Sequence, residues 1–516
     1  MSTMTTTPAG QCLPPEATVA VVGAGAMGAG IAQVAAMAGH PVKLFDTRAG
    51  AAEQAVDGIR AQLAKLALKG KVSEAAAQAA SSRLQAVQNL SDLTDAGLVI
   101  EAIVENLSAK QGLFAELEGI VSTGCLLASN TSSISITAIG APLRHPERLA
   151  GLHFFNPAPL MALVEVVSGL ATGPAVAATL HATASAWGKT AVFAKSTPGF
   201  IVNRVARPYY GEALRLRGEG AADCATLDAV MREAGGFRMG PFELMDMIGL
   251  DVNYAVSCTV WQAFFNDPRF LPSLQQQELV EAGFLGKKTG RGFYDYQAGA
   301  DLPAPRTEVL QPVPVAITVC GDSAAAQALV QRLSAAGVAF THVPSADGRV
   351  AQAGEAVLFV TDGRTATQRA FDSGIAQTVL LDLALDYRSA TRLALSTAGQ
   401  CDEAAARSAI GLLQAAGLKV SRLKDIPGLA VMRTVAMLAN EAADAVNQGV
   451  CSSAAADSAM RLGVNYPLGP LAWADRVGVP LIRQVLVNLA ASYGEDRYRL
   501  SPLIARHFYL GKNLHD

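Results

Sequence analysis

The sequence is short of charge, and its cysteines follow no recognisable pattern. Charged residues make up 16% of the 516 positions and the formal net charge is only -3, which gives no reason to expect a nucleic-acid partner. The seven cysteines are far apart, odd in number and without a C-x-x-C pair, which argues against a disulfide framework and against a metal centre. We therefore expect reduced thiols, no metal, and a cytoplasmic location. The cysteines are Cys12, Cys125, Cys224, Cys258, Cys320, Cys401 and Cys451.

The first residues also lack the features of a targeting segment. Residues 1–16 are polar and rich in threonine, without the basic and apolar regions of a secretory signal. By contrast, apolar residues make up 51% of the chain, which provides for a large core and excludes global disorder. A chain of this length is sufficient for about three or four domains of ordinary size.

A glycine-rich turn is the most informative single motif. The apolar run Val19–Val22 indicates a buried strand, and Gly23, Gly25 and Gly28 follow it with the spacing G-x-G-x-x-G. The first glycine of this motif permits a tight turn, the second lets the backbone approach a pyrophosphate, and the third lets the following helix pack closely on the strand. The N-terminus of that helix offers unpaired N–H groups to the phosphates. The motif predicts a dinucleotide site.

The residue that ends the next strand indicates which dinucleotide binds. Asp46 follows the strand Val42–Phe45 at the place where a carboxylate accepts from both ribose hydroxyls, which favours NAD, although the nearby Arg48 leaves NADP open. A membrane span is an alternative, because residues 19–42 carry no charge, but the strand-like start and the glycines argue against one continuous helix. A glycine turn without a nucleotide is a second alternative, and it leaves the ordered strand, helix, strand and acid unexplained.

The segments that follow predict two kinds of domain. Up to residue 195, strand-like apolar runs alternate with helical spacing, as in a doubly wound α/β domain of the Rossmann type, and residues 51–90 look helical apart from a break near Gly70. Ligands in such folds bind beyond the carboxyl ends of the strands, near the serine-rich turn 129–133. Residues 196–297 have helical spacing only. The expected domains are 1–195 (NAD-binding), 196–297 (helical), a proline-rich linker at 298–314, 315–425 (Rossmann-like) and 426–516 (helical).

The last two domains are expected because the chain contains an internal repeat. At a constant offset of 229 residues, Pro198-Gly199 matches Pro427-Gly428, and further identities recur through the helical segment. The second Rossmann-like segment has Cys320-Gly321-Asp322-Ser323 at the position of the glycine loop, where the acid would repel a phosphate. We therefore expect a second copy that retains its shape without the cofactor. The other matched positions are Arg204 with Arg433, Glu212 with Glu441, Asp228 with Asp457, Met231 with Met460, Gly240-Pro241 with Gly469-Pro470, Asp246 with Asp475, and Gly249 with Gly478.

Four polar residues stand where chemistry rather than packing would explain them. His153 ends one predicted strand and Glu165 lies inside the next, where an unpaired carboxylate would be costly to bury; paired with the histidine, it would fix the tautomer and raise the basicity of the ring. Ser132 in a turn and Asn203 in the first turn of a helix are able to bond a substrate oxygen. Each residue alone also has an ordinary structural explanation, as a core histidine, a solvated glutamate or a local backbone partner.

A series of motifs in this order resembles the 3-hydroxyacyl-CoA dehydrogenase family. The resemblance runs from about residue 17 to 297 and returns, degraded, in the helical repeat. It is carried by VVGAGAMGAGIAQVAAMAGHPVKLFD, VIEAIVENLSAK, SNTSSISI, GLHFFNPAPLMALVEVV, TPGFIVNRV, GGFRMGPFELMDMIGLD and GKKTGRGFYDY. In the second half Met432 replaces Asn203, and the closing GRGFYDY is absent after Gly511-Lys512, so only the first half is expected to be active.

The resemblance implies roles for individual positions. It implies a catalytic base at His153, its partner at Glu165, and substrate-orienting residues at Ser132 and Asn203. It implies coenzyme A contacts at Lys69 and at Gln62, where the family often has serine instead. The implied NAD contacts are Gly23, Gly25, Ala26, Met27, Gly28, Asp46, Glu105, Lys110, Ser132, Asn156 and Lys288.

The implied reaction is NAD-dependent oxidation of a 3-hydroxyacyl-CoA. The long form with a degenerate second half is similar to members that act in phenylacetate degradation, which implies 3-hydroxyadipyl-CoA, with 3-hydroxybutyryl-CoA as the alternative. A terminal carboxylate would require an arginine, for which Arg204, Arg207, Arg232 and Arg238 are available. A non-catalytic NAD-binding scaffold and a dehydrogenase of a small free hydroxy acid are the other hypotheses. We further expect an internal pseudo-dimer of the two helical domains, with homodimerisation open, and neither a nucleic-acid nor a membrane partner.

Overall fold

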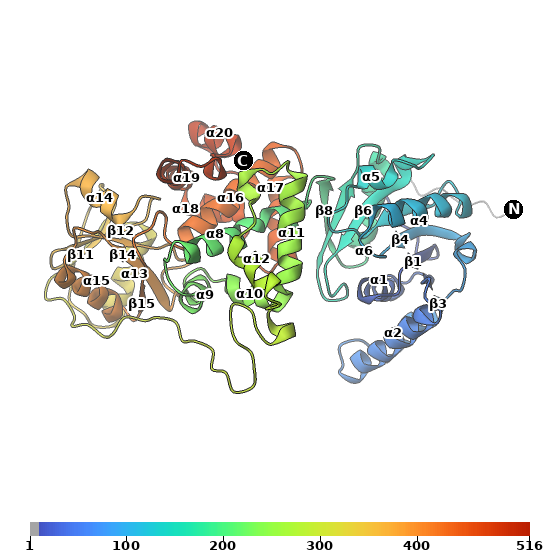
Figure 1. The fold of residues 1–516 in the computed structure, drawn as a ribbon, viewed down its shortest axis with the longest axis horizontal. Coiled ribbons are helices and arrows are strands. Elements are labelled where there is room, and N and C mark those ends of the chain that lie inside the picture. The colour runs from blue at the N-terminus through green and yellow to red at the C-terminus, as the bar shows by residue number, and fades with distance from the viewer. Residues whose placement is uncertain (1–9) are drawn as a thin grey trace. The chain divides into compact units, whose positions relative to one another are not determined.

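The chain forms two compact units in a computed structural model that describes residues 10–516 (Figure 1). The first unit comprises the chain up to Arg204 together with Gln448–Val464, and the second comprises Val205–Asn447 and Asn465–Asp516. The expectation that residues 1–16 contain no secretory signal falls largely on residues 1–9, which lie outside the described residues. Over residues 10–516, no helix has both the length and the apolarity that crossing a bilayer requires.

The first unit is built on an eight-stranded sheet in the order β3-β2-β1-β4-β5-β6-β7-β8. The strands from β3 to β6 run parallel to one another, whereas β6 and β7 are antiparallel and β7 and β8 are again parallel. This is the expected Rossmann-type arrangement, with the central β1 followed by the glycine loop. The strands are β1 (Thr18–Val22), β2 (Val42–Phe45), β3 (Leu84–Ala86), β4 (Ala96–Glu101), β5 (Leu126–Ser129), β6 (Leu149–Phe154), β7 (Leu163–Ser168) and β8 (Thr190–Lys195).

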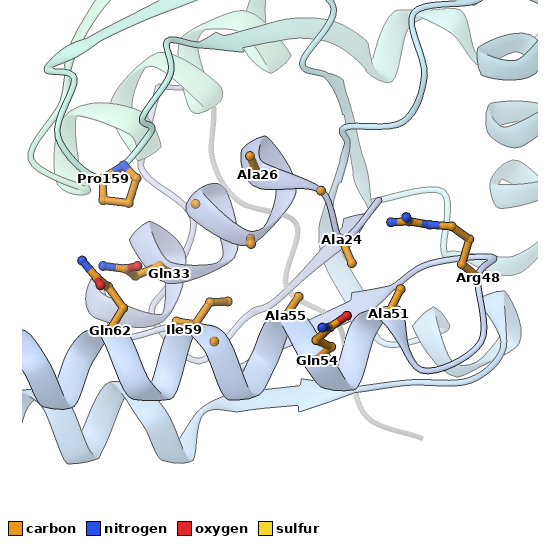
Figure 2. A pocket seen from close by; sticks show the side chains of 14 residues that line it. Ala24, Ala26, Gln33, Arg48, Ala51, Gln54, Ala55, Ile59, Gln62 and Pro159 are labelled. Atoms are coloured by element: carbon orange, nitrogen blue, oxygen red, sulfur yellow. The ribbon is translucent and has the colours of Figure 1, made fainter. Parts of the chain in front are cut away.

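Helices connect these strands, and α1 and α2 border a pocket (Figure 2). The helices are α1 (Ala26–Met37), α2 (Ala51–Leu68), α3 (Glu74–Ser82), α4 (Leu107–Ile120), α5 (Ile136–Gly140), α6 (Pro174–Ala186), α7 (Val202–Val205) and α17 (Ser453–Gly463), with 3₁₀ turns η1 (Leu90–Leu93) and η2 (Pro146–Arg148). The helical expectation for residues 51–90 is wrong at its end, because Leu84 pairs in parallel register with Val42 and adds an edge strand to the sheet.

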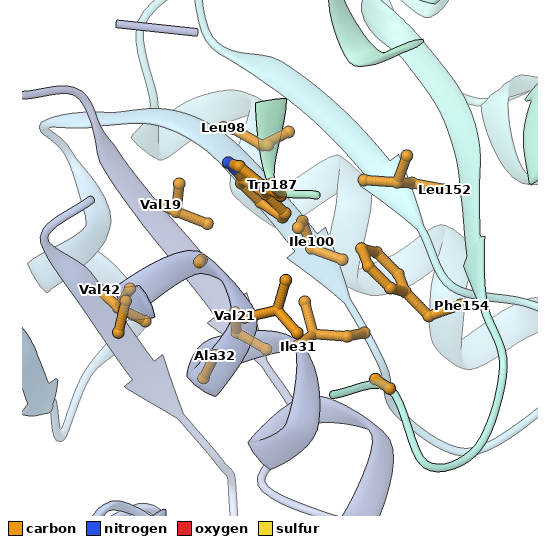
Figure 3. Close-up of a cluster of buried hydrophobic side chains, with 14 of the residues drawn as sticks. Val19, Val21, Ile31, Ala32, Val42, Leu98, Ile100, Leu152, Phe154 and Trp187 are labelled. Atoms are coloured by element: carbon orange, nitrogen blue, oxygen red, sulfur yellow. The ribbon is translucent and has the colours of Figure 1, made fainter. Parts of the chain in front are cut away.

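A core of small aliphatic residues joins the sheet to its helices (Figure 3). Val19 and Val21 of β1 pack with Ile31 of α1, and Trp187 at the end of α6 lies near Phe154 of β6, with 6.4 Å between the two ring centroids. All five side chains are at most 8% exposed. Strand β1 and helix α1 therefore pack directly against each other. This packing fixes the loop that joins them.

The second unit contains a seven-stranded sheet in the order β10-β9-β11-β12-β13-β14-β15. In contrast to the first sheet, an antiparallel hairpin strand, β11, lies between β9 and β12. The expected linker, residues 298–314, has no helix or strand, but it is tied to this sheet, since Glu308 N–H donates to Val420 O at 2.8 Å. The strands are β9 (Ile317–Cys320), β10 (Thr341–Val343), β11 (Arg349–Ala353), β12 (Ala356–Val360), β13 (Thr378–Leu381), β14 (Arg392–Thr397) and β15 (Lys419–Arg422).

Both helical copies contribute to the second unit. The first copy forms α8 (Arg207–Gly218), α9 (Cys224–Glu233), α10 (Pro241–Ile248), α11 (Leu250–Ala263) and α12 (Leu274–Glu281), with η3 (Pro268–Phe270) and η4 (Lys287–Thr289). The second copy forms α16 (Val431–Asn447), α18 (Pro470–Val477), α19 (Val479–Tyr493) and α20 (Pro502–Leu510), with η5 (Asp496–Tyr498). Helices α13 (Ala324–Ala335), α14 (Ala366–Ser373) and α15 (Glu403–Ala415) accompany the second sheet.

The two copies pack against each other through α8 and α16. Arg433 of α16 donates from Nε to Glu212 of α8 at 2.8 Å, and both side chains are at most 1% exposed. Tyr498 also donates to the same carboxylate, at 2.9 Å. Desolvation opposes the ionisation of Glu212, but the charges of Arg433 and Arg497 hold its pKa below the usual range. A buried pair of this kind fixes how one copy sits on the other.

Candidate active site

The three glycines of the loop after β1 occupy three different environments. Gly23 has a φ of +106°, and a Cβ there would lie 2.5 Å from the Ala102 carbonyl oxygen. A Cβ on Gly28 would lie 1.8 Å from the Gly23 carbonyl oxygen, so the helix packs too closely for any side chain. A Cβ on Gly25 would meet nothing within 4 Å. Open space beside Gly25, at an N-terminus of α1 that no side chain caps, suits a phosphate, and the amides of Ala26 and Met27 lie in that first turn.

Asp46 lies directly after β2 and beside the same loop. Its Oδ2 accepts from the Ala24 N–H at 2.8 Å and its Oδ1 from the Arg48 N–H at 2.9 Å. Arg48 also bonds the carboxylate through its guanidinium, with Nε at 3.1 Å from Oδ1. Burial raises the pKa of Asp46, but the hydrogen bonds from Arg48 and the two amides outweigh it and hold that pKa below its usual range. A charged acceptor is therefore fixed where a ribose is expected.

The pocket between α1 and α2 has a volume of about 440 Å³ and extends from the glycine loop along both helices (Figure 2). Arg48 lines one part of it, and Gln33 of α1 and Gln62 of α2 point toward each other in another part. Lys69 caps the C-terminus of α2 and is exposed. Gln62 thus borders the same pocket as Gly25, whereas Lys69 does not line it.

Glu105 organises the serine-rich turn that follows β5. Its Oε1 accepts from Thr131 Oγ1 at 2.6 Å, from the Ser132 N–H at 3.0 Å and from the Ser133 N–H at 3.2 Å. Burial raises the pKa of Glu105, but the Thr131 hydroxyl, the charge of Lys110 and the Ser132 N–H hold it below its usual range. The carboxylate expected to contact the cofactor therefore also sets the position of Ser132.

Lys110 is almost fully buried within an ion-pair network behind this turn. Its Nζ lies 2.6 Å from Glu101 Oε1 and 3.3 Å from Glu105 Oε2. Glu101, at the end of β4, also accepts from Ser129 Oγ at 2.6 Å and from the Ile103 N–H at 2.7 Å. The sequence interpretation assigned no role to Glu101; the signal available was a carboxylate that interrupts an apolar strand at its carboxyl end.

His153 and Glu165 are direct cross-strand partners on the antiparallel strands β6 and β7. The distance from His153 Nδ1 to Glu165 Oε2 is 2.6 Å, and the two residues are 6% and 0% exposed. The His153 ring lies against Phe155, with the centroids 4.4 Å apart, and near Phe200 at 5.9 Å. Because the carboxylate accepts, Nδ1 carries the proton and Nε2 is left with the lone pair, the arrangement that a proton acceptor requires.

Glu165 also connects the histidine to the start of α7. Its Oε1 accepts from the Ile201 N–H at 3.0 Å and from the Val202 N–H at 3.1 Å. The chain enters this helix through Gly199 and Phe200, whose φ values are +73° and +49°. The resulting turn brings Asn203 to the loop after β5, where its Nδ2 donates to the Ser132 carbonyl oxygen at 3.3 Å. His153, Glu165, Ser132 and Asn203 are thereby linked in one constellation.

A segment of the second helical copy completes the wall behind this constellation. Helix α17 contacts β7 and β8, and Lys195 N–H donates to Val450 O at 2.9 Å. Burial, followed by the negative charge of Glu165, raises the pKa of the Cys451 thiol to about 12, so it remains uncharged. Gln448 Oε1 accepts from Arg204 at 2.9 Å. Nothing in the sequence pattern assigned residues 448–464 to this side of the molecule.

The other predicted residues are more dispersed. Asn156 is exposed just beyond β6. Lys288 belongs to the second unit, where its Nζ pairs with Asp251 Oδ1 at 2.5 Å. Among the arginines considered for an acyl carboxylate, Arg204 bonds Gln448, Arg207 bonds Ser257 at 3.1 Å and Arg232 pairs with Glu243 at 2.9 Å. Arg238 is exposed. Within residues 10–516, no cluster of three or more histidine, cysteine, aspartate or glutamate side chains is arranged to hold a metal ion.

Around the positions that correspond to His153 and Glu165, the second half repeats the strand pairing and the turn of the first half but has different side chains. Leu380 pairs with Ser396 across β13 and β14 just as Gly151 pairs with Val167, both at the offset of 229. Asp382 and Ala394 therefore correspond to His153 and Glu165. Asp382 takes over the contact to the following helix, since its Oδ2 accepts from the Ala430 and Val431 N–H groups at 3.0 and 2.8 Å. The turn is retained as well, with φ values of +77° at Gly428 and +54° at Leu429. No proton acceptor pair remains at these positions.

Known families match the chain in the same order as its folded parts. Residues 18–197 match the family described as "3-hydroxyacyl-CoA dehydrogenase, NAD binding domain". Residues 199–296 and again 428–514 match "3-hydroxyacyl-CoA dehydrogenase, C-terminal domain". Residues 358–427 match "3-hydroxybutyryl-CoA dehydrogenase reduced Rossmann-fold domain". The predicted repeat and the reduced second Rossmann-like domain are thus confirmed.

Individual proteins are similar to the whole chain or to about half of it. The chain is 45% identical to the 3-hydroxyadipyl-CoA dehydrogenase of Escherichia coli (strain K12), covering 96% of this chain and 98% of that protein. It is 43% identical to a probable 3-hydroxybutyryl-CoA dehydrogenase of Bacillus subtilis, over 54% of this chain and 97% of that one. A crystal structure of 3-hydroxybutyryl-CoA dehydrogenase from E. coli K12 superimposes with a TM-score of 0.86 at 44% identity, covering 96% and 98% of the two chains. The chain belongs to the 3-hydroxyacyl-CoA dehydrogenase family.

Proposed function

We propose that this chain oxidises (3S)-3-hydroxyacyl-CoA to 3-oxoacyl-CoA with NAD, and that its substrate is 3-hydroxyadipyl-CoA. The observation that carries the reaction is the buried pair of His153 and Glu165, 2.6 Å apart beside the serine-rich turn. The similarity to a 3-hydroxyadipyl-CoA dehydrogenase over 98% of that protein's length supports the substrate.

In the proposed mechanism, His153 Nε2 removes the proton from the substrate's 3-hydroxyl. Glu165 holds Nδ1–H and thereby stabilises the imidazolium that forms. Ser132 and Asn203 orient the substrate oxygens, and a displacement of about 1 Å at this point would cost on the order of 100-fold in rate. NAD, when bound, supplies the hydride acceptor. In the reverse direction, the protonated His153 returns its proton to the developing alkoxide.

The glycine loop and Asp46 fit a dinucleotide, which supports NAD contacts at Gly23, Gly25, Ala26, Met27, Gly28 and Asp46. Contacts from Glu105, Lys110, Asn156 and Lys288 are part of the same proposal, as are coenzyme A contacts at Lys69 and Gln62. The Lys110 side chain is only 1% exposed. We therefore assign its effect on the cofactor chiefly to its ion pair with Glu105.

Substrate and cofactor are tested together by following NADH oxidation at 340 nm with 3-oxoadipyl-CoA and with acetoacetyl-CoA. We expect turnover of both with NADH, a higher kcat/KM for 3-oxoadipyl-CoA, and little turnover with NADPH. The names of several relatives favour 3-hydroxybutyryl-CoA as the second candidate, and a higher kcat/KM for acetoacetyl-CoA would select it. NADH binding without turnover of either compound would favour the non-catalytic scaffold instead.

Three organisational points belong to the same proposal. The contact of α8 with α16 supports an internal pseudo-dimer, in which the second copy serves as the partner of the first. Seven free cysteines support a cytoplasmic location. We also propose domains at 1–195, 196–297, 315–425 and 426–516 joined by the linker 298–314; limited proteolysis should then cut first within 298–314, and a first cut elsewhere would contradict these boundaries.

A further inference from the structure

The second unit contains a cavity of about 510 Å³ where the second half would have its active site. Met432, which corresponds to Asn203, lines it, and Leu383 beside Asp382 does so as well. The neighbouring Asp382 carboxylate is fully occupied by backbone N–H groups, because its Oδ1 accepts from Leu383 and Met432 at 2.8 and 2.9 Å. The cavity therefore has the place of a substrate pocket without the proton-transfer residues.

A dinucleotide does not suit this cavity. Ser323 accepts from the Ala326 N–H at 3.3 Å and so caps α13, in contrast to α1, whose N-terminus has no side-chain cap. Asp322 directly precedes Ser323 in the loop, and its side chain is 84% exposed, so that it adds negative charge where a pyrophosphate would approach.

The cavity wall is largely apolar, with cationic side chains at the rim. Trp473 and Met432 are 2% and 0% exposed, and Val350, Val360, Leu385 and Leu481 complete the apolar lining. Arg476 also lines the cavity; it is exposed, and none of residues 10–516 forms a hydrogen bond or ion pair with its side chain. The acidic groups nearby are engaged, since Asp362 pairs with Arg364 at 2.6 Å and Asp386 accepts from the Arg388 N–H at 3.0 Å. Positive charge thus remains available beside an apolar chamber.

The wall is also held in place by its own hydrogen bonds. Leu385 N–H donates to Ala234 O at 2.9 Å, and Tyr387 donates from its hydroxyl to Asp382 O at 3.0 Å. On another side, Asn488 Nδ2 donates to Asp362 O at 2.8 Å. A cavity that is already formed costs little conformational entropy to fill. Its volume lies in the range of small-molecule sites, of roughly 300–1,000 Å³.

We propose that this cavity is a second, non-catalytic site that binds a small carboxylate with an apolar aliphatic or aryl body. The apolar body fills the chamber lined by Trp473 and Leu481, and the carboxylate lies at Arg476. The site retains the location of the first-half pocket and recognises an acid rather than transforming it.

Isothermal titration of the full-length chain tests this proposal with hexanoate and 3-phenylpropionate as probes and hexanamide as the uncharged control. Filling the first half beforehand with NAD and acetoacetyl-CoA, both oxidised and unable to react with each other, directs the probe to the second half. We expect saturable binding of both acids, at least tenfold weaker binding of hexanamide, and a tenfold or greater loss of acid affinity in Arg476→Ala. Because Arg476 is exposed and unpaired within residues 10–516, its replacement should leave folding intact.

Arg506→Ala is the matched control, since Arg506 is exposed on α20 and does not line the cavity. Its affinity for hexanoate should equal that of the unmodified chain. The proposal is wrong if neither acid binds, if the two arginine variants behave alike, or if binding disappears once the first half is filled. None of these readouts depends on turnover, so they do not change if the proposed dehydrogenase activity fails.

Discussion

At the scale of single residues, His153 is the position where a substitution should most clearly slow the chemical step without weakening cofactor binding. The ring bonds Glu165 and lies beside Phe155 and Phe200, whereas the glycine loop follows a different strand, β1. We expect His153→Ala to lower kcat by about 10³-fold, the usual size of a lost general base, while NADH binding measured by fluorescence stays nearly unchanged. His145→Ala, at an exposed histidine paired with Glu147, is the control. A variant that loses NADH affinity yet turns over normally would disprove the assignment.

Asp46 should set the choice between NAD and NADP. Its carboxylate is held ionised beside Arg48, and a 2′-phosphate placed there would meet a like charge. Asp46→Ser should remove that repulsion and free Arg48, and lower the NADH/NADPH ratio of kcat/KM by about 100-fold, equivalent to about 2.7 kcal/mol. The control is Asp57→Ser, where the aspartate is exposed on α2. An unchanged ratio in Asp46→Ser would show that cofactor choice is made elsewhere.

Asp382 should make folding stability depend on pH. Burial raises its pKa to about 6, above the value of 3.8 for an unperturbed aspartate, so the folded state binds more protons than the unfolded state between these values. The stability that this group contributes is therefore greatest below pH 4 and declines as the pH rises to 6, by about 3 kcal/mol.

Urea unfolding at several pH values measures this effect against Asp382→Asn, which does not titrate. The free energy of unfolding of the unmodified chain, relative to that of the variant, should fall as the pH rises from 4.5 to 6.5. A difference that stays constant over this range would mean that Asp382 keeps an ordinary pKa.

At the scale of elements, α17 of the second copy packs against strands β7 and β8. A Cβ at Gly463 would lie 2.8 Å from Leu163 Cδ2 and 3.0 Å from Val202 Cγ2, and the backbone N–H of Val202 donates to Glu165. We expect Gly463→Ala to lower the melting temperature and to reduce kcat by about tenfold, since displacement of these neighbours moves the carboxylate.

Gly112→Ala is the matched control, because Gly112 lies inside α4 with nothing within 4 Å of an added Cβ. There the substitution should stabilise the chain by up to about 1 kcal/mol through helix propensity and leave kcat unchanged. Equal effects of the two substitutions would mean that α17 has no influence on the site.

Some of this architecture could be predicted from the sequence and some could not. Strand, glycine loop, helix and Asp46 are consecutive, so local patterns were enough to predict the cofactor fold. The pairing of His153 with Glu165 was expected from their chemistry, but only the antiparallel register of β6 and β7 makes them opposite partners. The buried network of Glu101 and Lys110 and the position of Gln448–Val464 depend on tertiary packing over long separations, which residue periodicity does not encode.

At the scale of the whole molecule, the second half should be required for the first to remain folded. Deleting residues 313–516 would remove α16 from α8 and leave the buried Glu212 without Arg433. It would also remove Gln448–Val464 from the unit that holds His153. We expect residues 1–312 to aggregate or to lose nearly all activity, as judged by size-exclusion chromatography and NADH oxidation. A truncated chain that is monomeric and fully active would contradict the pseudo-dimer.

Gln448–Val464 belongs to the same polypeptide as His153, and this has a consequence for how the enzyme responds to dilution. A wall supplied by a second molecule dissociates as concentration falls, whereas a wall on the same polypeptide is present at a fixed, high effective concentration. Specific activity should therefore be the same at picomolar and micromolar enzyme. This independence of concentration requires a longer chain, because every molecule carries its non-catalytic partner as part of its own polypeptide.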